Sequence, residues 1–161
     1  MLVEAAGIES AHETIATEAS TILCRTSLFS PHAASPGTQR TYNRWLMRRA
    51  AESDPVSMEE LRRLAAGRFG DMVKAVVDLK RGLMLLDADM HADQEAELLS
   101  EGATRRDLWG INLYPDMPDA DWLEFDSMIN LRPSFGNRSR GVDDPATRTA
   151  ITELVRRLVT R

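Results

Sequence analysis

Hydrophobic and polar residues alternate in two parts of the chain, and this alternation predicts strands. Residues 72–79 are rich in valine, and a short connection at 80–82 leads to an apolar run at 83–87. Residues 108–114 and 122–131 alternate in the same way, on either side of a loop rich in proline and aspartate. A period of two residues is typical of strands, and strands joined by short loops pair antiparallel. We therefore expect two β-hairpins.

Helical patterns precede, separate and follow these hairpins. A Ser-x-x-Glu capping box begins the first helix at Ser57, and the second helix covers residues 91–99 and ends before Gly102. The last helix begins at Asp144 and Pro145, because aspartate is favoured at the N-cap and proline in the first turn. The predicted fold class is α+β: a four-stranded, mainly antiparallel sheet of two hairpins with three helices on one face, in the order α-ββ-α-ββ-α.

The beginning of the chain has a different character. Residues 1–54 contain many small and polar residues, a segment rich in serine and proline at 30–38, and no apolar stripe apart from a short possible helix at 41–51. Such segments are usually poorly structured. We expect residues 1–54 to be an N-terminal extension, either a flexible tail or the product of a start codon upstream of Met47. Residues 55–161 are then a single α+β domain.

Composition and charge narrow the functional classes. The chain of 161 residues is 43% hydrophobic and 28% charged, which is typical of a globular protein. Its net charge of -5 argues against binding to nucleic acid or to an anionic membrane, and no apolar run is long enough to span a bilayer. A lone cysteine, Cys24, and the absence of a secretory signal pattern favour a cytoplasmic location.

Four segments carry a resemblance to a known family. They are FGDMVKAVVDLKRGLM, DADMHADQEAELLSEG, DLWGINLYPD and LEFDSMINLRPSFGNRSRGVDDP. Together they resemble an uncharacterised prokaryotic family of short proteins that is known only as a domain of unknown function, over about residues 57–159. The resemblance implies no activity, substrate or cofactor. It supports a natural start near Met47.

The loop before the last helix is the first candidate site. Its polar residues are Arg132, Asn137, Arg138, Ser139 and Arg140. Arginine forms forked hydrogen bonds with phosphate and carboxylate groups, so this loop indicates a binding module for an anionic small molecule or protein partner. The alternative is that Arg138 and Arg140 pair with Asp143 and Asp144 of the same chain. We expect no metal and no cofactor, because phosphate-loop, dinucleotide and zinc-ligand motifs are missing from the sequence.

A small hydrolase or nuclease-like enzyme is the alternative function. In it His91 acts as general base, Glu95 or Glu124 assists it, and Arg138 stabilises developing negative charge. This requires His91 and Arg138 to lie within the width of one substrate. The structural alternative is that acidic residues near His91 only complement the positive end of a helix, and that Glu124 lies on a solvated face.

A third hypothesis is a structural role. The apolar run at 83–86 would pair with a second subunit if it lay at the edge of the sheet. The sequence does not decide between these three functions.

Overall fold

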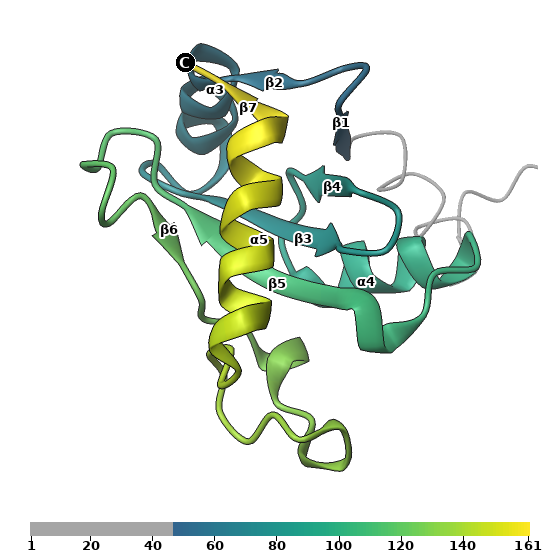
Figure 1. The fold of residues 1–161 in the computed structure, drawn as a ribbon. Coiled ribbons are helices and arrows are strands. Elements are labelled where there is room, and N and C mark those ends of the chain that lie inside the picture. Colours follow the sequence, from purple (N-terminus) through teal and green to yellow (C-terminus); the bar gives the residue numbers. More distant parts are fainter. Residues whose placement is uncertain (1–46) are drawn as a thin grey trace, which may run out of the picture. The chain divides into compact units, whose positions relative to one another are not determined.

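Backbone hydrogen bonds join five strands into one antiparallel sheet in the computed structural model, which describes residues Met47–Arg161 (Figure 1). The strand order is β1-β4-β3-β5-β6. These strands are β1 (Arg48–Ala51), β3 (Val73–Asp78), β4 (Leu83–Leu86), β5 (Leu108–Leu113) and β6 (Leu123–Glu124). The helices are α3 (Met58–Arg68), α4 (His91–Ser100) and α5 (Pro145–Leu158). The predicted α+β class and the three helices are therefore confirmed.

Short elements complete the fold. Strand β2 (Val56–Ser57) pairs in parallel with β7 (Val159–Thr160), which joins the start of α3 to the end of α5. Three short 3-10 helices, η1 (Arg105–Asp107), η2 (Met128–Asn130) and η3 (Pro133–Phe135), lie in the connections. In the described residues no helix is both long enough and apolar enough to cross a membrane.

Local signals in the sequence set the helix starts and the first hairpin. The Ser57 hydroxyl accepts a hydrogen bond from the backbone N–H of Glu60 at 3.1 Å, and the Asp144 carboxylate accepts one from the backbone N–H of Thr147 at 2.9 Å. Strands β3 and β4 pair antiparallel around Gly82, which has a φ of 65° that glycine adopts without strain. The capping box is only half formed, because the Glu60 carboxylate binds Arg48 instead of the Ser57 backbone.

The prediction of four strands was wrong, because a fifth strand, β1, pairs with β4. It lies within the segment that we assigned to the N-terminal extension, and it replaces a helix over residues 48–51. Its sequence, Arg-Arg-Ala-Ala, has no strand pattern of its own. The pairing with β4 and ion pairs from Arg48 to Glu60 and from Arg49 to Glu101 hold it in place. Residues 1–46 of the predicted extension, Cys24 among them, lie outside the described residues.

The second hairpin is shorter than predicted. Only Leu123–Glu124 pairs with β5, whereas the alternation extended to residue 131. Beyond β6, the Asn130 side chain takes the place of a strand: it accepts from the backbone N–H of Gly110 at 2.9 Å and donates to the Gly110 carbonyl at 2.9 Å. A Cβ at position 110 would lie 2.4 Å from the Ser127 hydroxyl, so glycine is needed for this close approach.

The helices cover both faces of the sheet, which corrects the expectation of one face. Helices α3 and α5 pack on one face, and Figure 1 shows α5 crossing it. Helix α4 packs on the other face, where Leu98 meets Val76, Leu85 and Leu108. Strand β4 is covered on both faces as predicted. It also has β1 on one edge and β3 on the other, so it offers no open edge to a second subunit.

Candidate functional site

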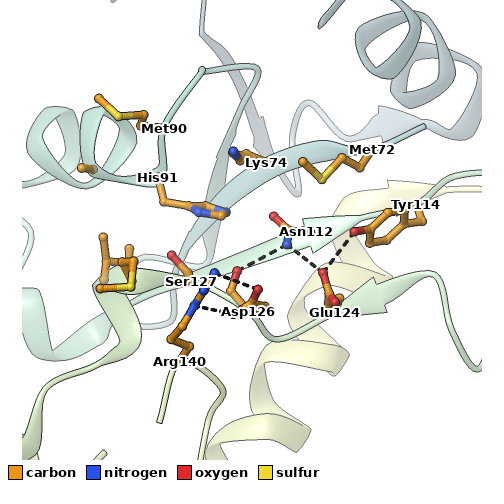
Figure 2. Close-up of a pocket in the computed structure, with 13 residues that line it drawn as sticks. Met72, Lys74, Met90, His91, Asn112, Tyr114, Glu124, Asp126, Ser127 and Arg140 are labelled. Carbon is orange, nitrogen blue, oxygen red and sulfur yellow. Dashed lines mark hydrogen bonds and ion pairs between the residues drawn. The ribbon is translucent and has the colours of Figure 1, made fainter. Parts of the chain in front are cut away.

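A cavity of about 470 Å³ lies beside the start of α4, on the face of the sheet that α4 only partly covers (Figure 2). This volume is within the range of small-molecule sites. Its apolar lining comes from five side chains: Met72, Met90, Ala92, Met128 and Ile129. Its polar lining comes from strands β3, β5 and β6, from α4, and from the segments on either side of η2.

Three polar side chains cross the cavity floor on neighbouring strands. Lys74 of β3 pairs in register with Asn112 of β5, and Asn112 pairs in register with Glu124 of β6. Residues directly opposite on antiparallel strands project to the same face, about 5 Å apart. The Asn112 amide donates to Glu124 Oε2 at 2.8 Å, and the Tyr114 hydroxyl donates to the same oxygen at 3.1 Å. Burial raises the pKa of Tyr114, and the neighbouring Glu124 adds to this rise.

Two residues that line this cavity each have a buried oxygen with no hydrogen-bond partner among the described residues. These oxygens are Asn112 Oδ1 and Ser127 Oγ, and their residues are only 6% and 1% exposed. The orientation of the Asn112 amide follows from its other contacts, because its Nδ2 faces two acceptors, Glu124 Oε2 and the Asp126 carbonyl. A flipped amide would point an oxygen at both acceptors. The unpaired Oδ1 therefore points away from these two acceptors, toward Lys74 and His91 in Figure 2, and it is buried beneath the cavity lining.

His91 is the first residue of α4, and its ring enters the cavity (Figure 2). Its Nε2 lies 2.8 Å from the Ile111 carbonyl oxygen, which only accepts, so Nε2 carries the proton. Burial lowers the pKa of His91, and the positive charges of Lys74 and Arg140 lower it further. The ring is therefore neutral at pH 7, with a lone pair on Nδ1.

The charges around the cavity are not all neutralised. Arg140 forms a forked ion pair with Asp126, with Nε–Oδ1 at 2.8 Å and Nη2–Oδ2 at 2.9 Å. Lys74 has no carboxylate partner in residues 47–161: its Nζ lies 4.4 Å from the centre of the Phe69 ring and 3.3 Å from the Asp89 carbonyl. The N-terminus of α4 also lines the cavity and has no side-chain cap. It therefore adds positive potential to the charge of Lys74.

The family comparison covers this site. A family model described as "Protein of unknown function (DUF5674)" matches residues 52–158, well over half of the chain. The chain belongs to the DUF5674 family. The resemblance predicted from the four sequence segments is confirmed, and every residue lining the cavity lies inside the range of the DUF5674 match. Searches of curated proteins and of solved structures found no match.

The loop of this DUF5674 protein at residues 132–141, here called the arginine loop, directs two of its predicted site residues inward. Arg132 stacks over Trp109, with 4.2 Å between its guanidinium carbon and the ring centre, and donates to the carbonyls of Arg105 and Leu108. Burial lowers the pKa of Arg132. Asn137 donates to the carbonyls of Asn130, Ser139 and Gly141 at 2.8, 3.0 and 2.8 Å.

The outer residues of the arginine loop differ in their contacts. The Ser139 hydroxyl donates to Asp143, and the backbone N–H of Arg138 donates to the same carboxylate at 2.6 Å. These bonds lower the pKa of Asp143. The Arg138 guanidinium has no partner among the described residues and does not line the cavity. Arg140 is the loop residue that reaches the cavity.

The predicted catalytic residues are divided between two places. His91 and Glu124 line the same cavity, but Glu95 does not, and its Oε1 lies 3.2 Å from Arg105 Nε. His91 and Arg138 do not share a cavity, and Arg140 stands where the enzyme hypothesis placed Arg138. The described residues contain no cluster of three histidine, cysteine, aspartate or glutamate side chains that would hold a metal ion.

Sequence reasoning missed Lys74, the unpaired cation of the cavity. One signal was present: Lys74 is the basic residue in a strand otherwise rich in valine and alanine. A charge on the face that a helix should cover indicates that the cover is incomplete at that point. Ser127 had no such signal, because its position depends on the gap above Gly110.

Proposed function

We propose that this protein binds a small anionic molecule in the cavity beside α4, with Lys74 as its main electrostatic contact. The observation that carries the proposal is the ammonium group of Lys74, which lies at the cavity and has no carboxylate partner in the described residues. A cation that no carboxylate of the chain neutralises is free to attract an anion, and the low dielectric of the cavity wall strengthens that attraction. A bound carboxylate or phosphate provides the opposite charge.

The start of α4 supports the same conclusion. Backbone N–H groups at a helix N-terminus are free to bind an anion where no side chain caps them. The N-cap of α4 is Met90, which makes no side-chain hydrogen bond, and Met90, His91 and Ala92 all line the cavity. An anion between Lys74 and this helix end meets both a full charge and a partial charge.

The residues of the arginine loop take different parts in this proposal. Arg140 contributes to the cavity wall, although Asp126 already neutralises its charge. Arg132 and Asn137 hold the loop through their buried hydrogen bonds, and Ser139 fixes the loop to Asp143. Their role is to hold Arg140 in position.

The test compares the two lysines of the chain, Lys74 and Lys80. Lys80 is exposed in the turn between β3 and β4 and does not line the cavity. We expect inorganic phosphate or a small carboxylate to raise the melting temperature of the wild type and of Lys80→Met equally. Lys74→Met, which keeps the apolar stem over Phe69, should weaken binding by about tenfold or more, since hydrogen bonds to charged groups contribute about 1.5–3 kcal/mol. Equal binding by both variants contradicts the proposal.

A second candidate function is acid–base catalysis at His91. The observation that favours it is the ring geometry: the Ile111 carbonyl fixes the proton on Nε2 and leaves a basic Nδ1 on a neutral ring. Glu124 and Lys74 line the same cavity and place a carboxylate and a cation beside this base. Hydrolysis of chromogenic esters or phosphates by the wild type, lost in His91→Gln with folding intact, supports catalysis. An equal rate in both proteins contradicts it.

A further inference from the structure

We infer that the ligand is a zwitterion, with a protonated amine close to its acidic group, as in an α-amino acid. This inference rests on the proposed function and adds the chemical class of the ligand. The row of Lys74, Asn112 and Glu124 presents a cation, an unpaired hydrogen-bond acceptor and a carboxylate in that order across three adjacent strands.

The unpaired acceptor is the first argument. Asn112 lines the cavity, and its buried Oδ1 receives no hydrogen bond in residues 47–161. Leaving a buried acceptor unsatisfied is costly, so a ligand that supplies a donor at this point gains affinity. A simple carboxylate has no donor to offer, and a phosphate ion offers only its hydroxyl group. A protonated amine has three.

The charge balance is the second argument. The basic side chains that line the cavity are Lys74 and Arg140, and the acidic ones are Glu124 and Asp126. Because Arg140 pairs with Asp126, the remaining charges are Lys74 at one end of the row and Glu124 at the other. An anion alone gains from Lys74 but is repelled by Glu124. A zwitterion places its carboxylate toward Lys74 and its ammonium toward Asn112 and Glu124.

The geometry agrees with an α-amino acid. Side chains directly opposite on paired strands lie about 5 Å apart, and the carboxylate and the amine of an α-amino acid are separated by one carbon. Lys74 and Asn112 are such a pair. The methionines and Ile129 on the cavity lining give an apolar side chain a surface to contact. A hydrophobic amino acid such as leucine therefore matches the lysine, the polar pair of Asn112 and Glu124, and the apolar side chains of the lining.

The experiment compares leucine with two analogues by calorimetric titration of the full chain. Isocaproate lacks the amine of leucine, and isoamylamine lacks the carboxylate. We expect leucine to bind about tenfold more tightly than either analogue, because each lost charged hydrogen bond costs about that factor. In Asn112→Ala the preference for leucine over isocaproate should fall to about twofold or less.

Lys80→Met is the control, because Lys80 is exposed in the turn between β3 and β4 and does not line the cavity. It should keep the preference for leucine. Isocaproate binding as tightly as leucine overturns the zwitterion inference and leaves the proposed anion site standing. Isoamylamine binding as tightly as leucine overturns both. If neither leucine nor any other amino acid binds while phosphate does, only the zwitterion inference fails.

Discussion

The arginine loop and the cavity use the same kinds of polar side chain in opposite ways. Asn137 in the loop donates to three carbonyls, and its Oδ1 accepts from the backbone N–H of Asp143 at 2.7 Å. Asn112 in the cavity donates through Nδ2, but its equally buried Oδ1 accepts nothing in the described residues. The loop has the residues that usually bind anions, but most of them bind other groups of the same chain.

This difference between the two asparagines distinguishes groups that stabilise the fold from groups that are available to a ligand. A buried polar group whose bonds are complete within the chain stabilises the fold, and its removal leaves other groups unsatisfied. A buried polar group with an unused acceptor stabilises the fold less and gains when a ligand arrives. Arginine also differs between the two regions: Arg132 is buried against Trp109 and backbone carbonyls, whereas Arg140 lies at the cavity wall.

Replacing each asparagine separately should give the largest difference in the free energy of unfolding between the two regions. We expect Asn137→Ala to lower the free energy of unfolding by about 3 kcal/mol, because several buried backbone groups lose their partner together. Asn112→Ala should cost about 1 kcal/mol, because water in the cavity replaces its bonds. Urea denaturation measures both values. Equal losses would show that the cavity is as much a part of the folding core as the loop.

A smaller effect should come from protonation of His91, which makes the free energy of unfolding depend on pH. Since burial lowers its pKa in the folded protein below the usual value, the unfolded chain binds a proton that the folded protein does not. Stability from the neutral ring is therefore present above about pH 6.5 and is lost as the pH falls below it, with a limiting slope of about 1.4 kcal/mol per pH unit.

The matched variant is His91→Gln, whose amide can still donate to the Ile111 carbonyl. The denaturation midpoint of each protein is measured at about pH 7.5 and at about pH 5.5. The difference between these two midpoints should be smaller in His91→Gln than in the wild type. An unchanged difference between the two pH values would mean that His91 titrates as an exposed residue. The His91 ring would then be in contact with solvent and would not be a fixed part of the cavity lining.

Local patterns predicted those parts of the fold that short-range physics determines. The cap at Ser57, the cap at Asp144 and the turn at Gly82 are all present, because each depends on neighbours in the sequence. Strand β1 was missed because Arg-Arg-Ala-Ala becomes a strand only when β4 offers its edge. The end of the second hairpin was missed because the Asn130 side chain replaces the strand pairing beyond β6.

The candidate site was predictable only in its residue types. The sequence indicated His91, Glu124 and Arg140, which the fold brings to one cavity, together with Arg132 and Asn137, whose hydrogen bonds close within the chain. Whether a polar group is satisfied depends on atoms that are distant in sequence, such as Ile111 for His91 and Arg105 for Arg132. Composition and spacing do not contain that information.

The most direct measurement is a ligand titration of isotope-labelled protein followed by NMR of the side-chain amides. Asn112 and Asn137 each give a pair of amide signals in one spectrum. The same titration therefore measures the response of the cavity and that of the arginine loop. As leucine or phosphate is added, the Asn112 signals should move with a saturating dependence on concentration, while those of Asn137 stay in place. Movement of Asn137 without Asn112 would contradict the assignment of the site to the cavity.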